Sequence, residues 1–385
     1  MYTLFDGSAH KNLLPLTFTK PVAHLRVGIF TIQQKWEKHL EQHVSVRTKD
    51  YLSTKFNGNN KAGGTGISAN ILPTSDLVDV IKNLENKQLL TYKGKLIAIN
   101  PLPAANENLD AYLKDFTKVE YDTEISTLDH PWDIFRKNDA EIRTDFEFIK
   151  IEKKRSKQSG VANTLINEKD IFIEEGAKVT GAFLNATDGP IYIAKDAEVM
   201  EGCLVRGPFA LCEHAGLKMG AKIYGATTVG PHCKVGGELN NVVMQAYSNK
   251  GHDGFLGNSV IGEWCNLGAD TNCSNLKNNY GNVKVYSYTE GKAIDTGLQF
   301  CGLIMGDHSK SGINTMFNTG TVVGVSANIF GGDFPPKHIP SFSWGNEKFT
   351  LEKAFDVAQR MMSRRNISFT NEDKKIFQEI LKLEQ

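Results

Sequence analysis

The sequence contains no run of eighteen consecutive apolar residues, and its first ten residues, MYTLFDGSAH, lack the basic start and apolar stretch of a secretory signal. It also lacks an excess of charge, because 44 acidic residues balance 44 basic ones in a chain of 385. We therefore expect a soluble cytoplasmic protein that neither spans a membrane nor binds nucleic acid through a general basic surface.

No two of the six cysteines have the CxxC spacing that is typical of zinc and redox motifs. Four of them fall on small or aliphatic positions of the repeat described next: Cys203, Cys233, Cys265 and Cys273. A free cysteine packs like a small hydrophobic residue. We therefore predict buried thiols rather than disulfides or zinc ligands.

The strongest positive feature is a series of eight aliphatic residues, each six positions after the one before it. These residues are Ile193, Val199, Val205, Leu211, Leu217, Ile223, Val229 and Val235. A period of six fits neither an α-helix nor a simple strand, and it is typical of hexapeptide-repeat solenoids. It predicts a parallel β-helix with 18 residues in each coil, stacked at the strand spacing of ~4.8 Å.

The six-residue period is interrupted twice. It stops after Val235 and returns at Ile261, then stops after Cys273 and resumes at Met305. Because a solenoid surface is uniform, a functional site is usually built where the chain leaves it. We therefore expect the site near these two interruptions.

The remaining sequence predicts three further regions around the β-helix of residues 166–340. Residues 1–150 alternate strand-like segments, at 1–5 and 95–100, with helix-like segments at 29–42 and 75–87, which indicates an α/β domain. The polar residues 151–165 read as a linker, and 341–385 as a helical tail with helices at 351–365 and 371–383, the second capped by Thr370.

Between the interruptions, residues 250–275 read KGHDGFLGNSVIGEWCNLGADTNCSN. This stretch resembles, without a gap, the acetyltransferase half of the bifunctional N-acetylglucosamine-1-phosphate uridylyltransferase/glucosamine-1-phosphate acetyltransferase family, including its archaeal members. The resemblance implies a left-handed β-helix, a homotrimer with the site between neighbouring subunits, and transfer of acetyl from acetyl-CoA to an amino-sugar 1-phosphate. It also implies a place in UDP-N-acetylglucosamine biosynthesis.

The same resemblance assigns roles to individual residues. His252 matches the general base of the family, and Lys284 matches a lysine near the sugar phosphate in archaeal members. The residues that match positions holding the amino sugar are Asn266 and Asn275, and those that match the acetyl-CoA path are Ala269, Gly312, Ile313 and Gly331.

The chemistry of these residue types agrees with such a reaction. An amine must lose a proton before it attacks a thioester, and a histidine that titrates near neutrality can accept that proton. Asparagine amides both donate and accept hydrogen bonds, so they can orient a sugar without adding charge. A solvated loop histidine, coil-corner asparagines and a surface lysine are the alternative interpretations.

Three residues depart from the family pattern. Phe255 stands where the family carries a tyrosine, Gln245 where bacterial members carry a lysine, and Gly236 where they carry an arginine that contacts the sugar phosphate. Either Lys250, Lys284 or Lys234 supplies the phosphate contact, or the acceptor differs from glucosamine 1-phosphate.

The first thirty residues resemble, more loosely, the opening of sugar-nucleotide pyrophosphorylases. The candidate nucleotide contacts are Lys11, Lys20, Arg26 and Asn100, and the substrate would be UTP or another nucleoside triphosphate. Asn100 replaces the aspartate that binds magnesium in that family, so Mg²⁺ is implied only if this domain is active and another carboxylate serves, with Asp6, Asp110 and Asp122 as candidates.

Two other functional hypotheses remain open. The chain is either a sugar-1-phosphate nucleotidyltransferase with the β-helix as a trimeric scaffold, or a binding or assembly protein without activity. A zinc site is a further alternative, because His214 and His232 lie 18 residues apart and should stack on one edge of the β-helix.

Overall fold

The computed structural model describes residues 1–58, 61–105, 107, 109–156 and 162–384, which form two compact units. Unit 1 contains residues 1–13, 19–25 and 30–130, and unit 2 contains residues 14–18, 26–29 and 131–385. The chain therefore passes from one unit to the other four times within its first thirty residues. In the part of the chain that the structure describes, no helix combines the length and the apolar character needed to cross a membrane.

Unit 1 contains a mixed six-stranded sheet, as an α/β domain requires. In sheet order its strands are β2 (Val44–Arg47), β1 (Tyr2–Phe5), β3 (Thr65–Ser68), β6 (Lys95–Asn100), β5 (Gln88–Tyr92) and β7 (Thr117–Glu120). Strand β1 runs parallel to β2 and β3, whereas β6 runs antiparallel to β3. A separate small sheet pairs β4 (Ile71–Leu72) with β8 (Ser126–Thr127).

Short helices connect these strands. They are α1 (Ala9–Asn12), η1 (Val22–His24), α2 (Ile32–Leu40), α3 (Asp50–Ser53), α4 (Ser75–Lys82), α5 (Leu109–Tyr112) and η2 (Leu113–Asp115). Helix α2 is shorter than predicted because Thr31 closes its start with a capping box and Glu41 ends it in a left-handed conformation.

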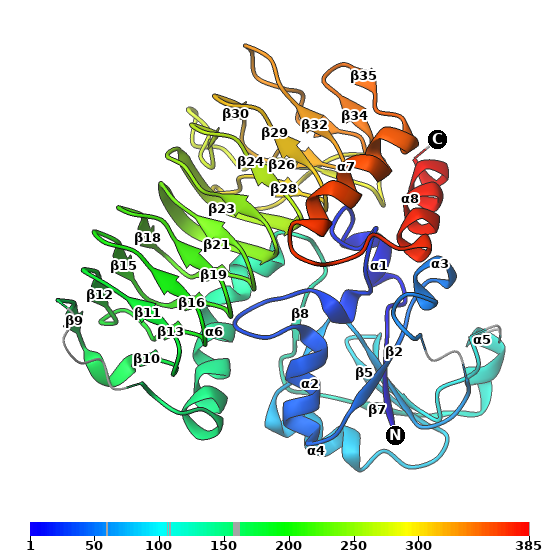
Figure 1. The fold of residues 1–385 in the computed structure, drawn as a ribbon. Coiled ribbons are helices and arrows are strands. Elements are labelled where there is room, and N and C mark those ends of the chain that lie inside the picture. Colours follow the sequence, from blue (N-terminus) through cyan, green and yellow to red (C-terminus); the bar gives the residue numbers. More distant parts are fainter. Residues whose placement is uncertain (59–60, 106, 108, 157–161, 385) are drawn as a thin grey trace. The chain divides into compact units, whose positions relative to one another are not determined.

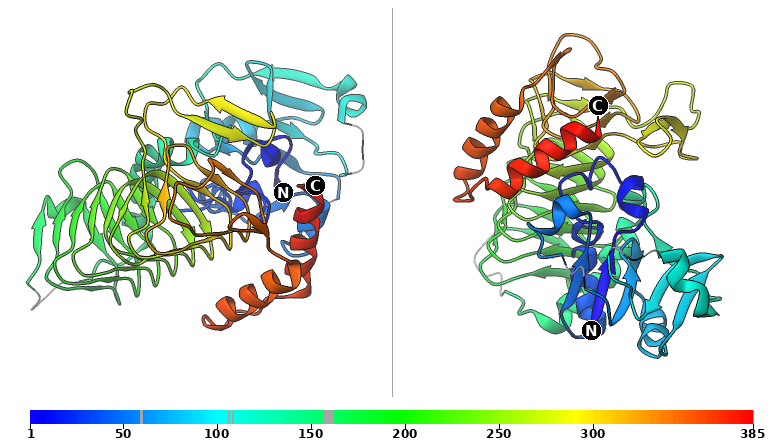
Figure 2. Two further views of the ribbon diagram at one scale, coloured as in Figure 1. Left: turned by 90° about the horizontal axis from the view of Figure 1, so that it is seen from above. Right: turned by 90° about the vertical axis from the view of Figure 1, so that its right-hand side faces the viewer.

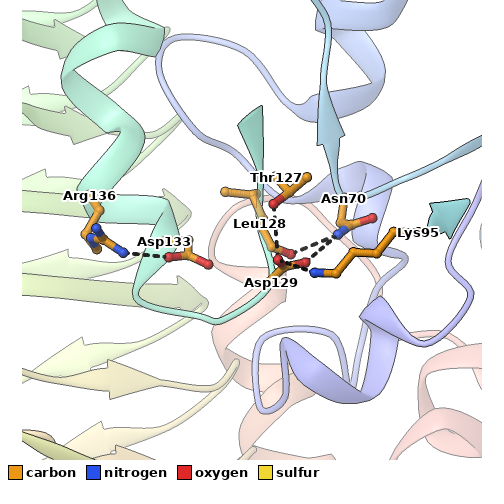
Figure 3. A network of polar contacts seen from close by, with 7 residues as sticks. All are labelled: Asn70, Lys95, Thr127, Leu128, Asp129, Asp133 and Arg136. Carbon is orange, nitrogen blue, oxygen red and sulfur yellow. Dashed lines mark hydrogen bonds and ion pairs between the residues drawn. The ribbon is translucent and has the colours of Figure 1, made fainter. Parts of the chain in front are cut away.

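Close to the end of unit 1, Asp129 gathers several donors. Its carboxylate accepts hydrogen bonds from the side chains of Asn70, Lys95 and Thr127 at 3.0–3.2 Å. These contacts, drawn in Figure 3, tie the segment that follows β8 to the loop between β3 and β4.

Unit 2 is the predicted parallel β-helix, whose coils are stacked like rungs (Figures 1 and 2). One face is a ten-stranded sheet of β11 (Lys178–Val179), β14 (Glu198–Val199), β17 (Gly216–Leu217), β20 (Lys234–Val235), β22 (Asn249–Lys250), β24 (Asn266–Leu267), β29 (Lys310–Ser311), β32 (Asn328–Ile329), β34 (Ser343–Trp344) and β35 (Glu347–Lys348).

The other two faces form one fifteen-stranded sheet, because the long strands β21 and β23 turn from one face into the next. Its strands are β9 (Thr164–Ile166), β10 (Ile171–Ile173), β12 (Phe183–Asn185), β13 (Ile191–Ile193), β15 (Leu204–Arg206), β16 (Phe209–Leu211), β18 (Lys222–Tyr224), β19 (Thr227–Val229), β21 (Glu238–Ala246), β23 (Phe255–Glu263), β25 (Asn272–Cys273), β28 (Ile304–Met305), β30 (Met316–Phe317), β31 (Val322–Val323) and β33 (His338–Ile339).

The register confirms the repeat. Ile193 lies beside Leu211, and Val199 beside Leu217, which are the 18-residue neighbours that the period predicts. The repeat aliphatics are buried in one continuous core. All six cysteines are free and buried, including the four whose repeat positions predicted buried thiols.

The two interruptions differ in kind. The first is a shortened coil, in which Val229 pairs with Met244 and Val235 pairs with Lys250, fifteen residues later instead of eighteen. The second is an insertion that carries the hairpin of β26 (Lys284–Ser287) and β27 (Lys292–Asp295). The coils then resume with Met305 beside Ile261.

Four helical elements complete unit 2: η3 (Glu168–Asp170), α6 (Asp133–Glu152), α7 (Leu351–Ser363) and α8 (Asn371–Leu383). Residues 131–150, which we expected in the first domain, group with the β-helix instead, and within α6 Asn138 donates to the Ala226 carbonyl at 2.8 Å. Thr370 caps α8 as predicted. Residues 157–161 of the expected linker lie outside the described residues.

Candidate functional site

His252 lies on a tight corner, residues 251–254, between β22 and β23. Its side chain and that of Asp253 are exposed. The Lys250 side chain, in contrast, is fully buried, and its ammonium group donates to the carbonyls of His252 at 2.6 Å and Asp253 at 2.9 Å. Lys250 therefore supports the backbone of this corner, and its ammonium group is not exposed for a phosphate group.

A strip without side chains crosses the coils beside this corner. Four successive coils place a glycine at the position that follows the inward-facing residue: Gly236, Gly251, Gly268 and Gly312. A Cβ added to Gly268 would come within 2.5 Å of the Gly312 backbone, whereas one added to Gly251 would meet no atom within 4 Å. At Gly268 only glycine lets the neighbouring coils come this close, and at Gly251 the missing side chain leaves open space next to His252 in the chain.

Asn266 and Ala269 belong to the next coil. Asn266 is exposed on β24, between Asn249 and Lys310 of the neighbouring coils. Ala269 is half-buried in the following corner, and its carbonyl accepts the Asn314 N–H at 2.8 Å. Asn266 and Ala269 thus lie on the coil that contributes Gly268 to the glycine strip.

Asn275 and Phe255 meet over Gly257. A Cβ on Gly257 would lie 2.5 Å from the Asn275 amide nitrogen and 2.6 Å from the Phe255 ring. The Asn275 amide also donates to the side-chain oxygen of Asn258 at 2.7 Å. The Asn275 amide is therefore already hydrogen-bonded to a residue of the neighbouring coil, and the Phe255 ring lies next to Gly257 as well.

The other predicted residues lie further along the chain. Lys284 is exposed on the hairpin, Gly312 belongs to the glycine strip, and Ile313 is 71% exposed. Gly331 lines a cavity of about 900 Å³ together with aromatic and proline residues of the last coils, among them Phe330 and Phe334.

Gln245 anchors a segment from the beginning of the chain. Its side-chain oxygen accepts the Arg26 N–H at 2.6 Å, and its nitrogen donates to the Arg26 carbonyl at 3.0 Å. The same segment is held by Asn138, which accepts the Gly28 N–H, and by Thr228, which donates to the Gly28 carbonyl. Gln245, at the position where bacterial members of the family carry a lysine, thus has a structural role here.

The four candidate nucleotide contacts are not brought together. Lys11 is exposed and Lys20 is buried in unit 1, whereas Arg26 belongs to unit 2. Because β6 is antiparallel to β3, Asn100 lies at the edge where β1 begins, and its amide donates to the Leu84 carbonyl at 2.8 Å.

The carboxyl edge of β1 and β2 instead borders a cavity of about 330 Å³ that sequence reasoning missed. It is lined by Asp6, Arg47 and Lys49 among others. The available signal was the polar run Arg47 to Asp50 at the end of a buried strand, since ligands of such sheets bind beyond the carboxyl ends of parallel strands. Burial raises the pKa of Asp6 to about 6, against the opposing hydrogen bonds from Thr48 and the Val22 N–H.

Residues 2–154 match the family model described as a sugar nucleotidyl transferase. Over 146 residues the chain is 29% identical to a bifunctional sugar-1-phosphate nucleotidylyltransferase/acetyltransferase of Sulfurisphaera tokodaii, a match covering 37% of this chain and 36% of that protein. It is 26% identical over 149 residues to the bifunctional protein GlmU of Trichodesmium erythraeum, covering 38% and 28%. It is also 38% identical over 73 residues to GlmU of Methanocaldococcus jannaschii, covering 19% and 17%.

The matches span about a third of the length of the first two relatives. They confirm the family resemblance that the sequence indicated. The N-terminal unit is accordingly nucleotidyltransferase-like, and it precedes a parallel β-solenoid with a helical tail.

The structure places two of the three acidic magnesium candidates of the nucleotidyltransferase-like unit, Asp6 and Asp122. Among the described residues, no three His, Cys, Asp or Glu side chains gather where they could hold a metal ion. The Asp6 carboxylate already accepts from Thr48 and from the Val22 N–H, and Asp122 is exposed. The side chain of Asp110 lies outside the described residues.

His214 and His232 do stack on one edge of the β-helix, as their spacing predicts. Their ring centroids are 4.8 Å apart with planes 17° from parallel, and Tyr247 and Trp264 continue the column. Imidazole lone pairs point outward in the ring plane, so two stacked rings cannot direct them at one ion. This geometry supports packing and not zinc ligation.

Proposed function

We propose that the β-helix is an acetyl-CoA-dependent N-acetyltransferase for an amino-sugar 1-phosphate. The observation that carries this proposal is the side-chain-free strip at Gly236, Gly251, Gly268 and Gly312, which includes the residue immediately before the exposed His252. A thin, extended ligand such as a pantetheine chain requires a path of this kind. The relative from Sulfurisphaera tokodaii, whose name includes acetyltransferase, gives further support.

In this reaction His252 accepts a proton from the sugar ammonium, so that the amine can attack a thioester carbonyl. The exposed Asn266 amide orients the sugar, and Asn275 contributes through the part of its amide that Asn258 leaves available. Backbone N–H groups at the corner of Ala269 are suited to the oxyanion that develops on the acyl carbon. Acetyl-CoA supplies the acyl group when bound, along Gly312, Ile313 and Gly331.

The phosphate contact must differ from that of the bacterial enzymes. Gly236 contributes no side chain, Gln245 holds Arg26, and Lys250 is buried beneath its own corner. Lys284 is exposed, and we assign it the sugar phosphate. Lys284→Ala should raise the Michaelis constant for the phosphorylated sugar and leave that for acetyl-CoA unchanged.

The experiment is an acetyl-CoA assay with glucosamine 1-phosphate and glucosamine, in which the released thiol is measured. We expect His252→Ala to lower turnover at least ~10²-fold with little change in the Michaelis constant for acetyl-CoA. His43→Ala, a change at an exposed histidine of unit 1, is the control. Absence of thiol release from the unmodified protein would contradict the proposal.

A second activity, sugar-1-phosphate nucleotidyl transfer, is favoured by the family model over residues 2–154 and by the cavity at Asp6, Arg47 and Lys49. Its test is pyrophosphate release from UTP or dTTP with a sugar 1-phosphate and added Mg²⁺. Arg47→Ala should abolish that release. A homotrimer is part of the same proposal and is tested by the mass of the protein in solution.

A further inference from the structure

Lys250 occupies a position that the other coils fill with aliphatic residues, with the exception of Ser311. Along the ten-stranded face the inward residues are Val199, Leu217, Val235, then Lys250, and after it Leu267, Ser311 and Ile329. The Lys250 side chain is fully buried there. An ammonium group inside a coil is costly unless its hydrogen bonds are satisfied.

The hydrogen bonds of this ammonium are made to the corner that carries His252. It donates to the carbonyls of His252 and Asp253, at 2.6 and 2.9 Å, so both carbonyls are turned inward. Burial lowers the pKa of Lys250 to about 8, while the nearby Asp253 and Asp270 act in the opposite direction. Lys250 thus remains mostly charged at neutral pH, when hydrogen bonds to carbonyls are strongest.

The corner is also fixed from two other directions. A Cβ on Gly237 would lie 2.8 Å from the His252 carbonyl oxygen, and a Cβ on Gly254 would lie 2.3 Å from the Thr271 carbonyl. The coils above and below therefore leave no room for the corner to move along the axis. The ammonium of Lys250 supplies the remaining restraint, from inside the coil.

We propose that Lys250 is a positioning residue, whose buried ammonium group fixes the backbone of residues 251–254 and thereby the direction in which His252 points. With both carbonyls bound inside, the side chain of His252 is exposed on the outer face, next to Gly251 in the chain. In the shortened coil, Lys250 stands where an aliphatic residue is expected, two residues before the proposed base His252. This inference rests on the proposed function in one respect, the role of His252 as the base.

The test uses Lys250→Met, which replaces the ammonium with an apolar chain of similar length. Exchange of a buried charge for a hydrophobic residue often leaves stability unchanged. Lys250→Leu, the residue type found at positions 217 and 267, is the second variant. Lys310→Met is the control, since the Lys310 ammonium donates to the His308 carbonyl at 2.7 Å, on a different corner.

We expect both Lys250 variants to fold, with turnover about 10- to 100-fold lower and an unchanged Michaelis constant for acetyl-CoA. The N–H groups of Gly236 and Glu238 donate to the Lys250 and Gly254 carbonyls on either side of the corner. Amide hydrogen exchange at Gly236 and Glu238 should accelerate in both variants and stay unchanged in the Lys310→Met control. The exchange measurement does not require activity, so it tests the corner even if the unmodified protein transfers no acetyl group, an outcome that would overturn the proposed function alone.

Unchanged exchange at Gly236 and Glu238 would overturn the positioning role, whatever the activity. Normal turnover with faster exchange would show that the restraint has no consequence for His252, and would also overturn it. If both variants failed to fold, the ammonium would be required by the coil itself, and the positioning role would likewise be rejected.

Discussion

The side-chain amide of Gln245 pairs with both backbone polar groups of Arg26, accepting from its N–H at 2.6 Å and donating to its carbonyl at 3.0 Å. A residue of the shortened coil thus holds a segment that lies 219 positions earlier in the sequence. The pairing explains why a glutamine suits this position, because a lysine offers no acceptor for the Arg26 N–H.

We predict that Gln245→Ala destabilises the protein by about 2–4 kcal/mol, because it leaves two backbone groups without their hydrogen bonds in a largely buried place. The midpoint of urea unfolding measures this change. Gln42→Ala, at an exposed glutamine, should stay within about 0.5 kcal/mol of the unmodified protein. Equal midpoints for the two variants would show that the Arg26 segment is not held by Gln245.

Two glycines of the strip should respond differently to alanine. Gly268→Ala forces a Cβ to within 2.5 Å of the Gly312 backbone and should cost about 1–3 kcal/mol or more. Gly251→Ala meets no atom within 4 Å, so its stability should be normal, but its methyl group enters the strip beside His252. Its Michaelis constant for acetyl-CoA should therefore rise. A stable Gly251→Ala enzyme with unchanged acetyl-CoA kinetics would remove this part of the strip from the acetyl-CoA path.

His338 should make the protein less stable in mild acid. Burial lowers the pKa of His338 to about 4, and the ring stacks on Tyr286 with centroids 3.6 Å apart. In the unfolded chain a histidine titrates near 6.5, so below that pH protonation favours unfolding. The loss of stability should grow as the pH falls from about 6.5 toward 4, and it should be absent above about 7.

The variant that isolates this effect is His338→Phe, which keeps an aromatic ring against Tyr286 and cannot be protonated. The difference in stability between His338→Phe and the unmodified protein should favour the variant more at pH 5 than at pH 7.5. Urea midpoints at the two pH values give the comparison, and they cancel contributions from other groups such as Asp6. The same difference at both pH values would assign the acid sensitivity elsewhere.

The stacked histidines should not respond to zinc. Because the rings of His214 and His232 lie face to face, we expect the same melting temperature with zinc chloride and with EDTA. A zinc-dependent rise in the melting temperature that disappears in His214→Ala would show instead that this edge binds zinc.

The sequence was sufficient to predict the β-helix because its coils repeat a local rule. Each hexad needs one inward aliphatic residue, and Ile193 to Val235 keep that rule without exception. The shortened coil could not be predicted in this way, since a lysine at an inward position reads as a surface residue until its carbonyl partners are known. Likewise, the place of Asn100 depends on the direction of β6 in the sheet, which the six residues of that strand do not encode.

The site shows the same division. The motif at residues 250–275 located His252, Asn266 and Ala269 on neighbouring coils, which followed from the repeat. It did not reveal that Asn275 is engaged by Asn258 or that Arg26 leaves unit 1, because both depend on contacts between segments far apart in the chain.

The docking of residues 26–29 sets an order of events during synthesis. These residues leave the ribosome early, but their partners Asn138, Thr228 and Gln245 follow 110 to 219 positions later. At about 5–20 residues per second, the nascent segment waits roughly 10–40 s for its last partner. Truncated nascent chains that end before residue 245 should therefore expose this segment to proteases, and full-length chains should protect it.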